Sequence, residues 1–227
     1  MPLTKGAFEG VDWPKHLGAY VVSGSRHQPR LQGYEVQSDL ARYYSFAEVA
    51  LASLIGEIPS ESVAQAFNTA LVFLAPVSIT EAPAHAARLT QLIGGDAAGV
   101  VATTAVALAE ASRFLVEEHL ALLAALNDGD EQLPELFRTE SEAQREAVKR
   151  LLTALPSDLM VSFLDQDPTL NAALICVLFA CGLRHEQELV AILTTARLPC
   201  AIAEGIADPN PHFERYPTNT PEFHYEP

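Results

Sequence analysis

The sequence predicts an all-α fold, and three observations lead to this prediction. After residue 35, apolar residues recur at helical spacing between recognisable helix start and stop signals. Strand-like alternation of apolar and polar residues is not found after that point. The composition, with 49% hydrophobic and 19% charged residues, is typical of a globular protein. We therefore expect residues 1–227 to form a single helical domain.

The first 35 residues are the exception to the helical pattern. They contain several Gly and Pro residues and predict an irregular N-terminal segment (1–35), with one short strand at Ala19–Ser23. A helix follows, because Ser45 and Glu48 form a capping box in which each side chain binds a free backbone N–H. Gly56 then favours the left-handed conformation that ends a helix.

The later helices are predicted from similar signals. Their expected ranges are 60–75, 82–93, 96–126, 139–155, 169–183 and 186–207. The segment 96–126 begins with Ala, Gly, Val and Thr, whose small side chains allow close packing, so we expect this helix to be central. Thr139 and Glu142 predict a second capping box. Residues 208–227 are rich in proline and predict an extended C-terminal tail.

The charge balance excludes several classes of partner. There are 14 Lys and Arg against 29 Asp and Glu, which gives a net charge of -15. Such a field repels nucleic acid and anionic membrane surfaces, so we expect neither as a partner. The longest apolar run, Ala172–Gly182, is shorter than the roughly 20 residues that span a bilayer. With no signal-peptide pattern at the start of the sequence, we expect a cytoplasmic protein.

The cysteines and histidines do not predict a metal site. Cys176, Cys181 and Cys200 are an odd number, which suggests reduced thiols, and the first two lie in an apolar run like small core residues. The sequence has no CxxC or HxxxH pair, so we expect no metal and no cofactor.

Four segments carry motifs that occur together in one known superfamily. They are Leu31–Pro59, Ala82–Leu115, Thr169–Leu183 and Ala191–Tyr225. They include a Gly-Tyr turn before a helix pair, an Ala-Ala-Arg helix before a small-residue helix, the stretch TLNAALICVLFACGL, and an Ala-Arg-Leu-Pro helix before an extended tail. In this order they resemble the citrate synthase superfamily, in particular its shorter citryl-CoA lyase branch.

The resemblance implies a shortened, two-lobed helical fold that works as a dimer. In that superfamily, three groups make or break a C–C bond next to a thioester carbonyl. A carboxylate moves the α-proton, one His binds the enol oxygen, and a second His in a Gly-Phe-Gly-His loop binds the keto acid.

This sequence departs from the family at all three groups. The family's catalytic Asp falls on Asn171, whose amide cannot abstract a proton from carbon. Ser78 falls nearest to the position of the first His, while His85 aligns within the following helix. The Gly-Phe-Gly-His loop, which also supplies basic residues for CoA phosphates, has no counterpart. The resemblance therefore gives Asn171, Ser78 and His85 as candidate catalytic positions at which the family's own catalytic residues are lost.

Several of these residues also have ordinary structural interpretations. Asn171 could instead cap the start of its helix. Arg197 lies within an apolar helix, where it either forms an intramolecular ion pair or, as the resemblance implies, reaches across a dimer to clamp a substrate carboxylate. Arg88 and Arg215 match further substrate-binding positions of the family. His119, next to two glutamates, is interpreted as a solvated surface residue.

Three functions remain open from the sequence. The first is a citrate synthase-like subunit that has lost catalysis and serves as a partner, scaffold or regulator, as a homodimer or as a heterodimer with an intact citrate synthase-like chain. The second is a divergent enzyme of C–C bond formation or cleavage on a small carboxylate or acyl-CoA. The third is a sensor that binds a small di- or tricarboxylate through Arg88 and Arg197.

Overall fold

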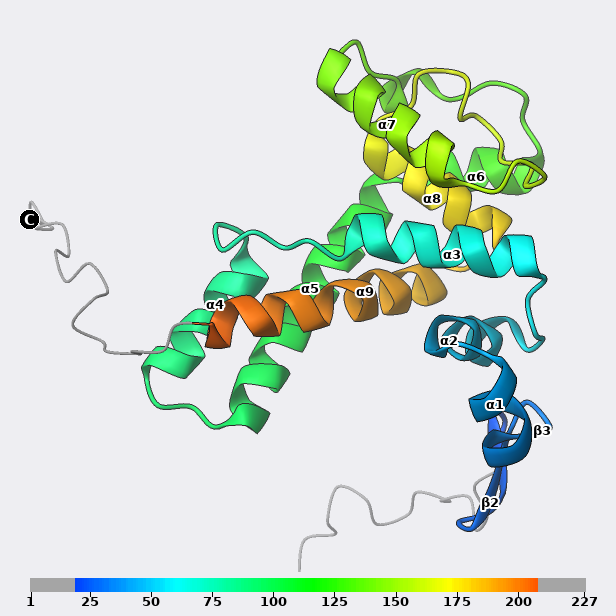
Figure 1. Ribbon diagram of the computed structural model, residues 1–227. Coiled ribbons are helices and arrows are strands. Elements are labelled where there is room, and N and C mark those ends of the chain that lie inside the picture. The colour runs from blue at the N-terminus through cyan, green and yellow to red at the C-terminus, as the bar shows by residue number, and fades with distance from the viewer. Residues whose placement is uncertain (1–18, 208–227) are drawn as a thin grey trace, which may run out of the picture. The chain divides into compact units, whose positions relative to one another are not determined.

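Helices dominate the structure, which confirms the predicted fold class (Figure 1). The computed structural model describes residues 19–207. The chain divides into two compact units, Met1–Ile58 and Pro59–Pro227. Residues 1–18 and the predicted tail from 208 to 227 lie outside the described part.

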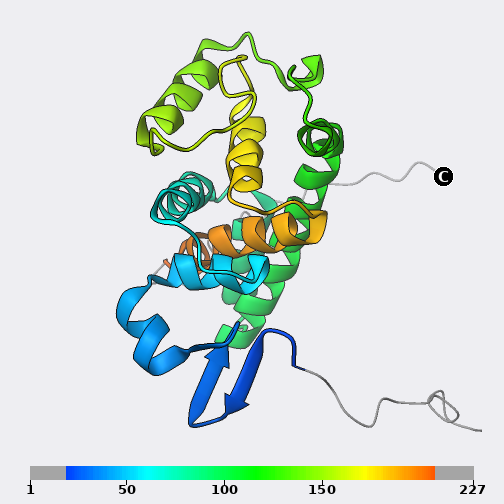
Figure 2. The same ribbon diagram turned by 90° about the vertical axis from the view of Figure 1, so that its right-hand side faces the viewer.

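The first unit begins with a small antiparallel sheet. Its strands are β1 (Val22–Ser25), β2 (Gln28–Leu31) and β3 (Tyr34–Glu35), in that order across the sheet. The first pair is in register with Val22 opposite Leu31, and Figure 2 shows the resulting hairpin. The prediction of an irregular segment with one strand at Ala19–Ser23 was therefore wrong for residues 22–35. Two-residue turns at 26–27 and 32–33 join short runs that are too brief to show clear alternation.

The helices of the first unit follow the sheet directly. A π-helical turn, η1 (Val36–Leu40), leads into α1 (Ala41–Tyr43) and α2 (Phe46–Ile55). The predicted capping box of α2 is confirmed: Ser45 accepts from the Glu48 N–H, and the Glu48 carboxylate accepts from the Ser45 N–H at 2.7 Å. Gly56 ends the helix with a φ of 84°, as the sequence predicted.

The second unit contains seven α-helices within its described residues, 59–207. They are α3 (Glu61–Leu74), α4 (Ala82–Leu92), α5 (Ala97–Glu118), α6 (Leu120–Asp128), α7 (Glu142–Ala154), α8 (Leu170–Ala180) and α9 (Glu186–Ile206). A short 3₁₀ turn, η2 (Glu135–Phe137), precedes α7.

Two groups of helices make up the second unit. Helices α4, α5 and α9 pack against one another, so the small-residue helix α5 is central as predicted. Helix α3 contacts α7, α8 and α9 and so joins this group to a second one in which α8 packs against α6 and α7 (Figure 1). The residues Ala172–Phe179 of α8 are all buried, which explains why that helix is apolar on every side.

The predicted helix over 96–126 is broken at His119 into α5 and α6. The His119 ring is buried: its Nδ1 lies 2.8 Å from the Leu115 carbonyl oxygen, and the ring stacks on Phe137 with centroids 5.0 Å apart. The interpretation of His119 as a solvated residue was therefore wrong. Its two glutamate neighbours suggested an exposed face, but the break in the helix turns the ring inward.

The predicted second capping box is also wrong, although its helix forms. Ser141 is the N-cap of α7 and makes no side-chain capping bond. Instead the Thr139 hydroxyl accepts from the Ser141 N–H at 3.1 Å, a local turn that competes with the capping geometry.

Among residues 19–207, two helices have the length and apolar composition of a membrane span. They are α5 and α9, and 28% of the most apolar stretch of each is buried. From the sequence, only the run Ala172–Gly182 was compared with the length of a membrane span. Central helices of globular proteins share these properties, and α5 and α9 pack against each other and against α4.

Candidate functional site

A cavity of about 420 Å³ lies within the second unit, where its two groups of helices meet. The C-terminal end of α3, the loop that follows it, α5, the start of α8 and the middle of α9 all contribute to its wall. Its apolar wall includes Phe73, Leu74, Leu115, Leu174 and Leu193. Its hydrogen-bonding or charged side chains are Glu81, Ser112, Glu118, Asn171 and Arg197.

Arg197 is held by an ion pair to Glu81. The guanidinium Nη2 donates to Glu81 Oε2, and the arginine side chain is only 17% exposed. The other oxygen, Glu81 Oε1, accepts from the backbone N–H of Ser78 at 2.8 Å. The intramolecular interpretation of Arg197 is therefore the one that the structure displays, and both oxygens of the glutamate are engaged.

Ser78 is connected to the cavity only through Glu81. Its hydroxyl lies 2.9 Å from that of Thr80 and accepts from the Thr80 N–H at 3.2 Å. The Ser78 side chain thus stabilises the exposed turn before α4. Ser78 itself is not among the residues that line the cavity.

Asn171 lines the cavity from the first turn of α8. The N-cap of that helix is Thr169, whose hydroxyl accepts from the Ala172 N–H at 3.3 Å. The interpretation of Asn171 as the capping amide was therefore wrong. Asn171 is exposed and makes no side-chain hydrogen bond to another residue within 19–207.

His85 and Arg88 lie on α4 and do not line the cavity. His85 is exposed, and Arg88 is half-buried where α4 packs against α9. Arg215 lies outside the described residues. Of the predicted site residues, the fold thus brings Asn171 and Arg197 to one cavity and leaves the two α4 residues out of it.

Ser112 and Glu118 are cavity residues that the sequence did not reveal. Ser112 is 1% exposed, and its hydroxyl has no hydrogen-bond partner among the described residues. Glu118 is exposed at the end of α5. Neither stands out in the sequence, because serine is common in small-residue helices and Glu118 belongs to a pair of glutamates. What distinguishes them is their place on the cavity wall, which α5 shares with residues of α8 and α9.

Few titratable side chains line this cavity. Two carboxylates and one guanidinium are its titratable groups, and no His, Cys or Lys among residues 19–207 lines it. Across the same residues, no three His, Cys, Asp or Glu side chains form a group suited to a metal ion. Glu118 is the carboxylate left without an ion pair in the described part, so it is the strongest candidate for a base there.

The buried cysteines belong to the core. Burial raises the pKa of the thiols of Cys176 and Cys181 to about 12, and the Cys181 thiol lies 3.7 Å from the Val63 carbonyl oxygen. Their predicted role as small core residues is confirmed. Cys200, on α9, is exposed.

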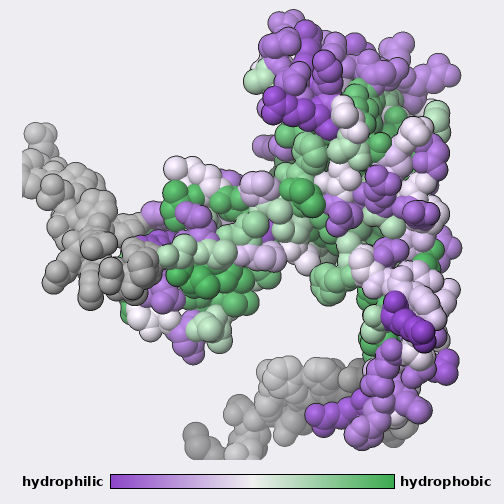
Figure 3. Space-filling model, viewed as in Figure 1, coloured by the Kyte–Doolittle hydropathy of each residue, from purple (hydrophilic) through white to green (hydrophobic). Residues whose placement is uncertain are grey.

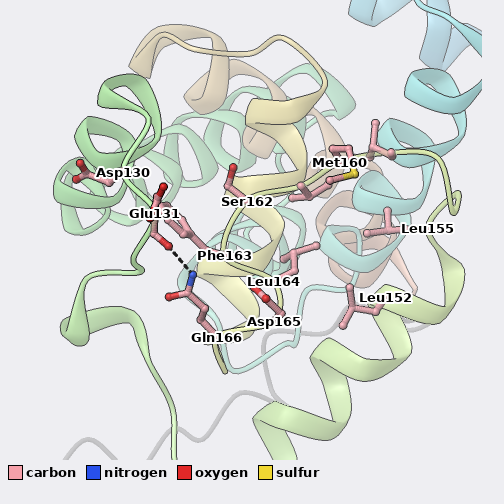
Figure 4. A pocket seen from close by; sticks show the side chains of 12 residues that line it. Asp130, Glu131, Leu152, Leu155, Met160, Ser162, Phe163, Leu164, Asp165 and Gln166 are labelled. Atoms are coloured by element: carbon pink, nitrogen blue, oxygen red, sulfur yellow. Dashed lines mark hydrogen bonds between the residues drawn. The ribbon is translucent and has the colours of Figure 1, made fainter.

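A second cavity, of about 610 Å³, lies between the end of α7 and the loops 130–133 and 159–166 (Figure 4). Its wall is mostly apolar, with three carboxylates: Asp130, Glu131 and Asp165. Gln166 joins the two loops, since its side-chain amide donates to the Glu131 carbonyl at 2.9 Å and accepts from the Leu133 N–H at 2.8 Å. None of the predicted site residues lies in this second cavity.

Comparison with known proteins supports the fold. No protein-family model and no curated protein matches the sequence. Among solved structures, citryl-CoA lyase from Hydrogenobacter thermophilus matches with a TM-score of 0.68 over 93% of this chain and 96% of its own, at 15% sequence identity. The chain therefore has a citrate synthase-like fold, as the four sequence motifs predicted.

Proposed function

We propose that this protein is a non-catalytic citrate synthase-like subunit that acts as a partner, scaffold or regulator. The observation that carries the proposal is the content of the cavity that Asn171 lines: its one arginine is already paired with Glu81, and no histidine within 19–207 reaches it. A condensation or cleavage next to a thioester needs a base and an electrophilic group near the reacting carbons. An amide in place of the carboxylate supplies neither.

The pairing of Arg197 also argues against a carboxylate sensor. A di- or tricarboxylate would have to displace Glu81, which is held by the Ser78 N–H as well as by the arginine. That exchange replaces one ion pair by another and adds further negative charge beside Glu118. Arg88, the other arginine of that hypothesis, is not a cavity residue.

A divergent enzyme is the second candidate, and one observation favours it. Glu118 lines the same cavity as Asn171, so a carboxylate is available from a different helix. If Glu118 serves as the base in place of the residue at position 171, general base catalysis is retained although the family's own carboxylate is lost.

The test on the purified protein is a thiol-release assay with acetyl-CoA and oxaloacetate and, separately, an assay of oxaloacetate formation from citryl-CoA, whose C–C cleavage leaves the thioester intact. We expect no turnover above background, because losing a general base costs about a hundred- to ten-thousand-fold and losing the electrophile multiplies that loss. Turnover that Asn171→Ala or Glu118→Gln abolishes would refute the proposal, and the variant that abolishes it would identify the base. The Glu61→Gln variant, on α3 and outside the cavity, is the matched control.

The partner is tested by purification of the tagged chain from its native host. We propose that it dimerises with itself or with an intact citrate synthase-like chain. In the mixed assembly this subunit would change the rate of its partner, and Arg197→Ala would alter that effect if the arginine contributes to the partner's site. Recovery of a monomer without any such chain would contradict the partner role.

A further inference from the structure

The second cavity, of about 610 Å³, has an apolar side and an acidic side. Leu152, Leu155 and Met160 line one side, and Asp130 and Glu131 line the other (Figure 4). Met160 is 90% exposed and Leu152 is 42% exposed, so the apolar side lies open to solvent. Apolar surface of this kind, bordered by polar residues, is typical of a site where another molecule binds.

The floor between these two sides is fixed by the chain itself. Phe163 and Leu164 line the cavity there and are buried. Phe163 has a φ of 70°, a conformation that a bulky residue adopts only where its surroundings enforce it. Gln166 joins the loop 159–166 to the loop 130–133 through its two side-chain hydrogen bonds. Because the cavity is formed before a partner arrives, less conformational entropy is lost on binding.

The charge of the cavity indicates which partner it suits. Asp130, Glu131 and Asp165 are exposed and form no ion pair with any residue between 19 and 207. No Lys, Arg or His of that part of the chain lines the cavity. Basic side chains are therefore attracted to the acidic side, whereas nucleic acid, an acidic peptide or an anionic membrane is repelled. A partner with apolar and basic residues on adjacent faces matches both sides at once.

The terminal segments of this chain do not have the charge that the cavity favours. Residues 208–227 contain one arginine against four acidic residues, and residues 1–18 contain two lysines against two acidic residues. The whole chain carries a net charge of -15, so a second copy is also repelled. These charges favour a different protein as the occupant.

We propose that the second cavity binds a basic amphipathic helix of a partner protein. The apolar face of that helix lies against Met160, and its Lys or Arg side chains face Glu131 and Asp165. An amphipathic helix presents an apolar stripe beside charged residues, which is the arrangement that this cavity complements. The inference deepens the partner role of the proposed function, on which it rests, by stating where a partner binds and through which chemistry.

The experiment is a fluorescence anisotropy titration of a rhodamine-labelled peptide with the full chain. The peptide has twelve residues built from the repeat Lys-Leu-Leu-Lys, and the titration is run at physiological salt. Two control peptides replace every Lys by Glu or every Leu by Ser. We expect a dissociation constant on the order of ten micromolar for the first peptide and binding at least about tenfold weaker for each control.

The acidic side is tested with a triple variant, Asp130→Asn, Glu131→Gln and Asp165→Asn. It should weaken the Lys-Leu peptide about tenfold, because three exposed charge contacts are lost and each contributes little. A matched triple variant removes the same net charge at exposed positions outside the cavity: Glu61→Gln, Glu140→Gln and Glu204→Gln. This control should weaken the peptide by no more than about twofold, since its charges act only from a distance.

The apolar side is tested with Met160→Ser. It should weaken the Lys-Leu peptide about fivefold, because the peptide covers this side chain when it binds. The matched control is Val72→Ser, on α3 and 61% exposed, which should leave the affinity unchanged. Both positions are exposed, so we expect both variants to fold.

Several results would overturn the inference. Equal weakening by the two triple variants, or equal binding of the Lys-Leu and Lys-Ser peptides, would show attraction by net charge alone. A loss of self-association in Met160→Ser, measured by light scattering, would identify a second copy as the occupant. Turnover plays no part in the titration, so the activity assays can refute the proposed function while the peptide separately decides the docking site.

Discussion

Arg197 is the residue whose surroundings change its interpretation most. From the sequence, an arginine within an apolar helix could equally serve a neighbouring subunit or an internal carboxylate. The carboxylate is Glu81, which is 116 positions away in the chain and belongs to the turn before α4. A contact of that range follows from how α9 crosses α4, and no local pattern encodes it.

A double-mutant cycle measures this ion pair. We expect Glu81→Gln, Arg197→Met and the double variant to give a coupling free energy of about 1–2 kcal/mol in urea unfolding, because the arginine is largely buried while the glutamate is 40% exposed. The Arg113–Glu117 pair, whose side chains are 44% and 45% exposed, should give a clearly smaller coupling free energy because solvent screens it. Equal values for the two pairs would contradict the burial-based expectation.

The three cysteines should react at very different rates. At pH 8, a thiol reagent should label only Cys200 in the native protein, because Cys176 and Cys181 are buried and remain protonated. All three should react in denaturant. Rapid labelling of more than one thiol per native chain would disprove the predicted burial.

Burial of the Cys176 and Cys181 thiols also makes the free energy of unfolding depend on pH. The pKa of each buried thiol rises from 9.0 to about 12, so the native state holds these protons more tightly than the unfolded state does. Their contribution to stability is therefore complete below pH 9 and is lost as the pH rises from about 9 to about 12. Urea unfolding of Cys176→Ala across this range should show a shallower decline than the unaltered chain.

At the scale of elements, the sequence predicted helices where local signals agree with the packing. Ser45, Glu48 and Gly56 fix α2 by hydrogen bonds and backbone conformation within a few residues, so a local pattern was sufficient. The break at His119 was missed because the ring's stacking on Phe137 arises between segments that are distant in the sequence.

The candidate site was predictable only in part for the same reason. Asn171 and Arg197 could be selected because the family motif places them, and both reach the cavity. Ser112 and Glu118 could not be selected, since what distinguishes them is the space beside α5 that α8 and α9 leave open. Glu81 was missed because its partner is far away in the sequence.

Close packing of α9 against α4 can be tested at Gly205. A Cβ atom built there would lie 2.5 Å from the Ala87 Cβ and 3.0 Å from the Ala87 carbonyl carbon. We therefore expect Gly205→Ala to lower the free energy of unfolding by about 1–3 kcal/mol, although alanine favours a helix over glycine by about 1 kcal/mol.

Gly99, in the first turn of α5, is the matched control for Gly205. A Cβ there would have Asp96 Oδ1, at 3.3 Å, as its nearest neighbour, and the glycine N–H is already bonded to that cap oxygen. Gly99→Ala should change stability by no more than about 1 kcal/mol in either direction. If both variants were equally stable, α4 and α9 would not be as close as the structure places them.

At the scale of the whole molecule, the second unit exposes more apolar surface than its core requires. Large apolar side chains at the C-terminal end of α4 and on α5 lie open to solvent: Ile93 is 70%, Val106 66% and Phe114 57% exposed. Figure 3 shows apolar surface gathered over the region of α5 and α9. Contiguous apolar surface of this kind is typical of a site of association.

We predict that this surface forms a two-fold interface and that Val106→Glu disrupts it. In an isologous dimer each residue occurs twice, so one substitution places two charges in the interface and should raise the dimer dissociation constant about a hundredfold or more. Light scattering at tens of micromolar should then change from dimer to monomer. Met160→Glu, at a 90% exposed position in the second cavity, should leave the dimer intact.

Three other outcomes would contradict this prediction. If Val106→Glu does not affect the dimer, the interface lies elsewhere on the chain. If the unaltered chain is a monomer, association with an intact citrate synthase-like chain remains as the way to cover this surface. Recovery of the chain only in detergent would instead identify α5 and α9 as membrane-associated helices.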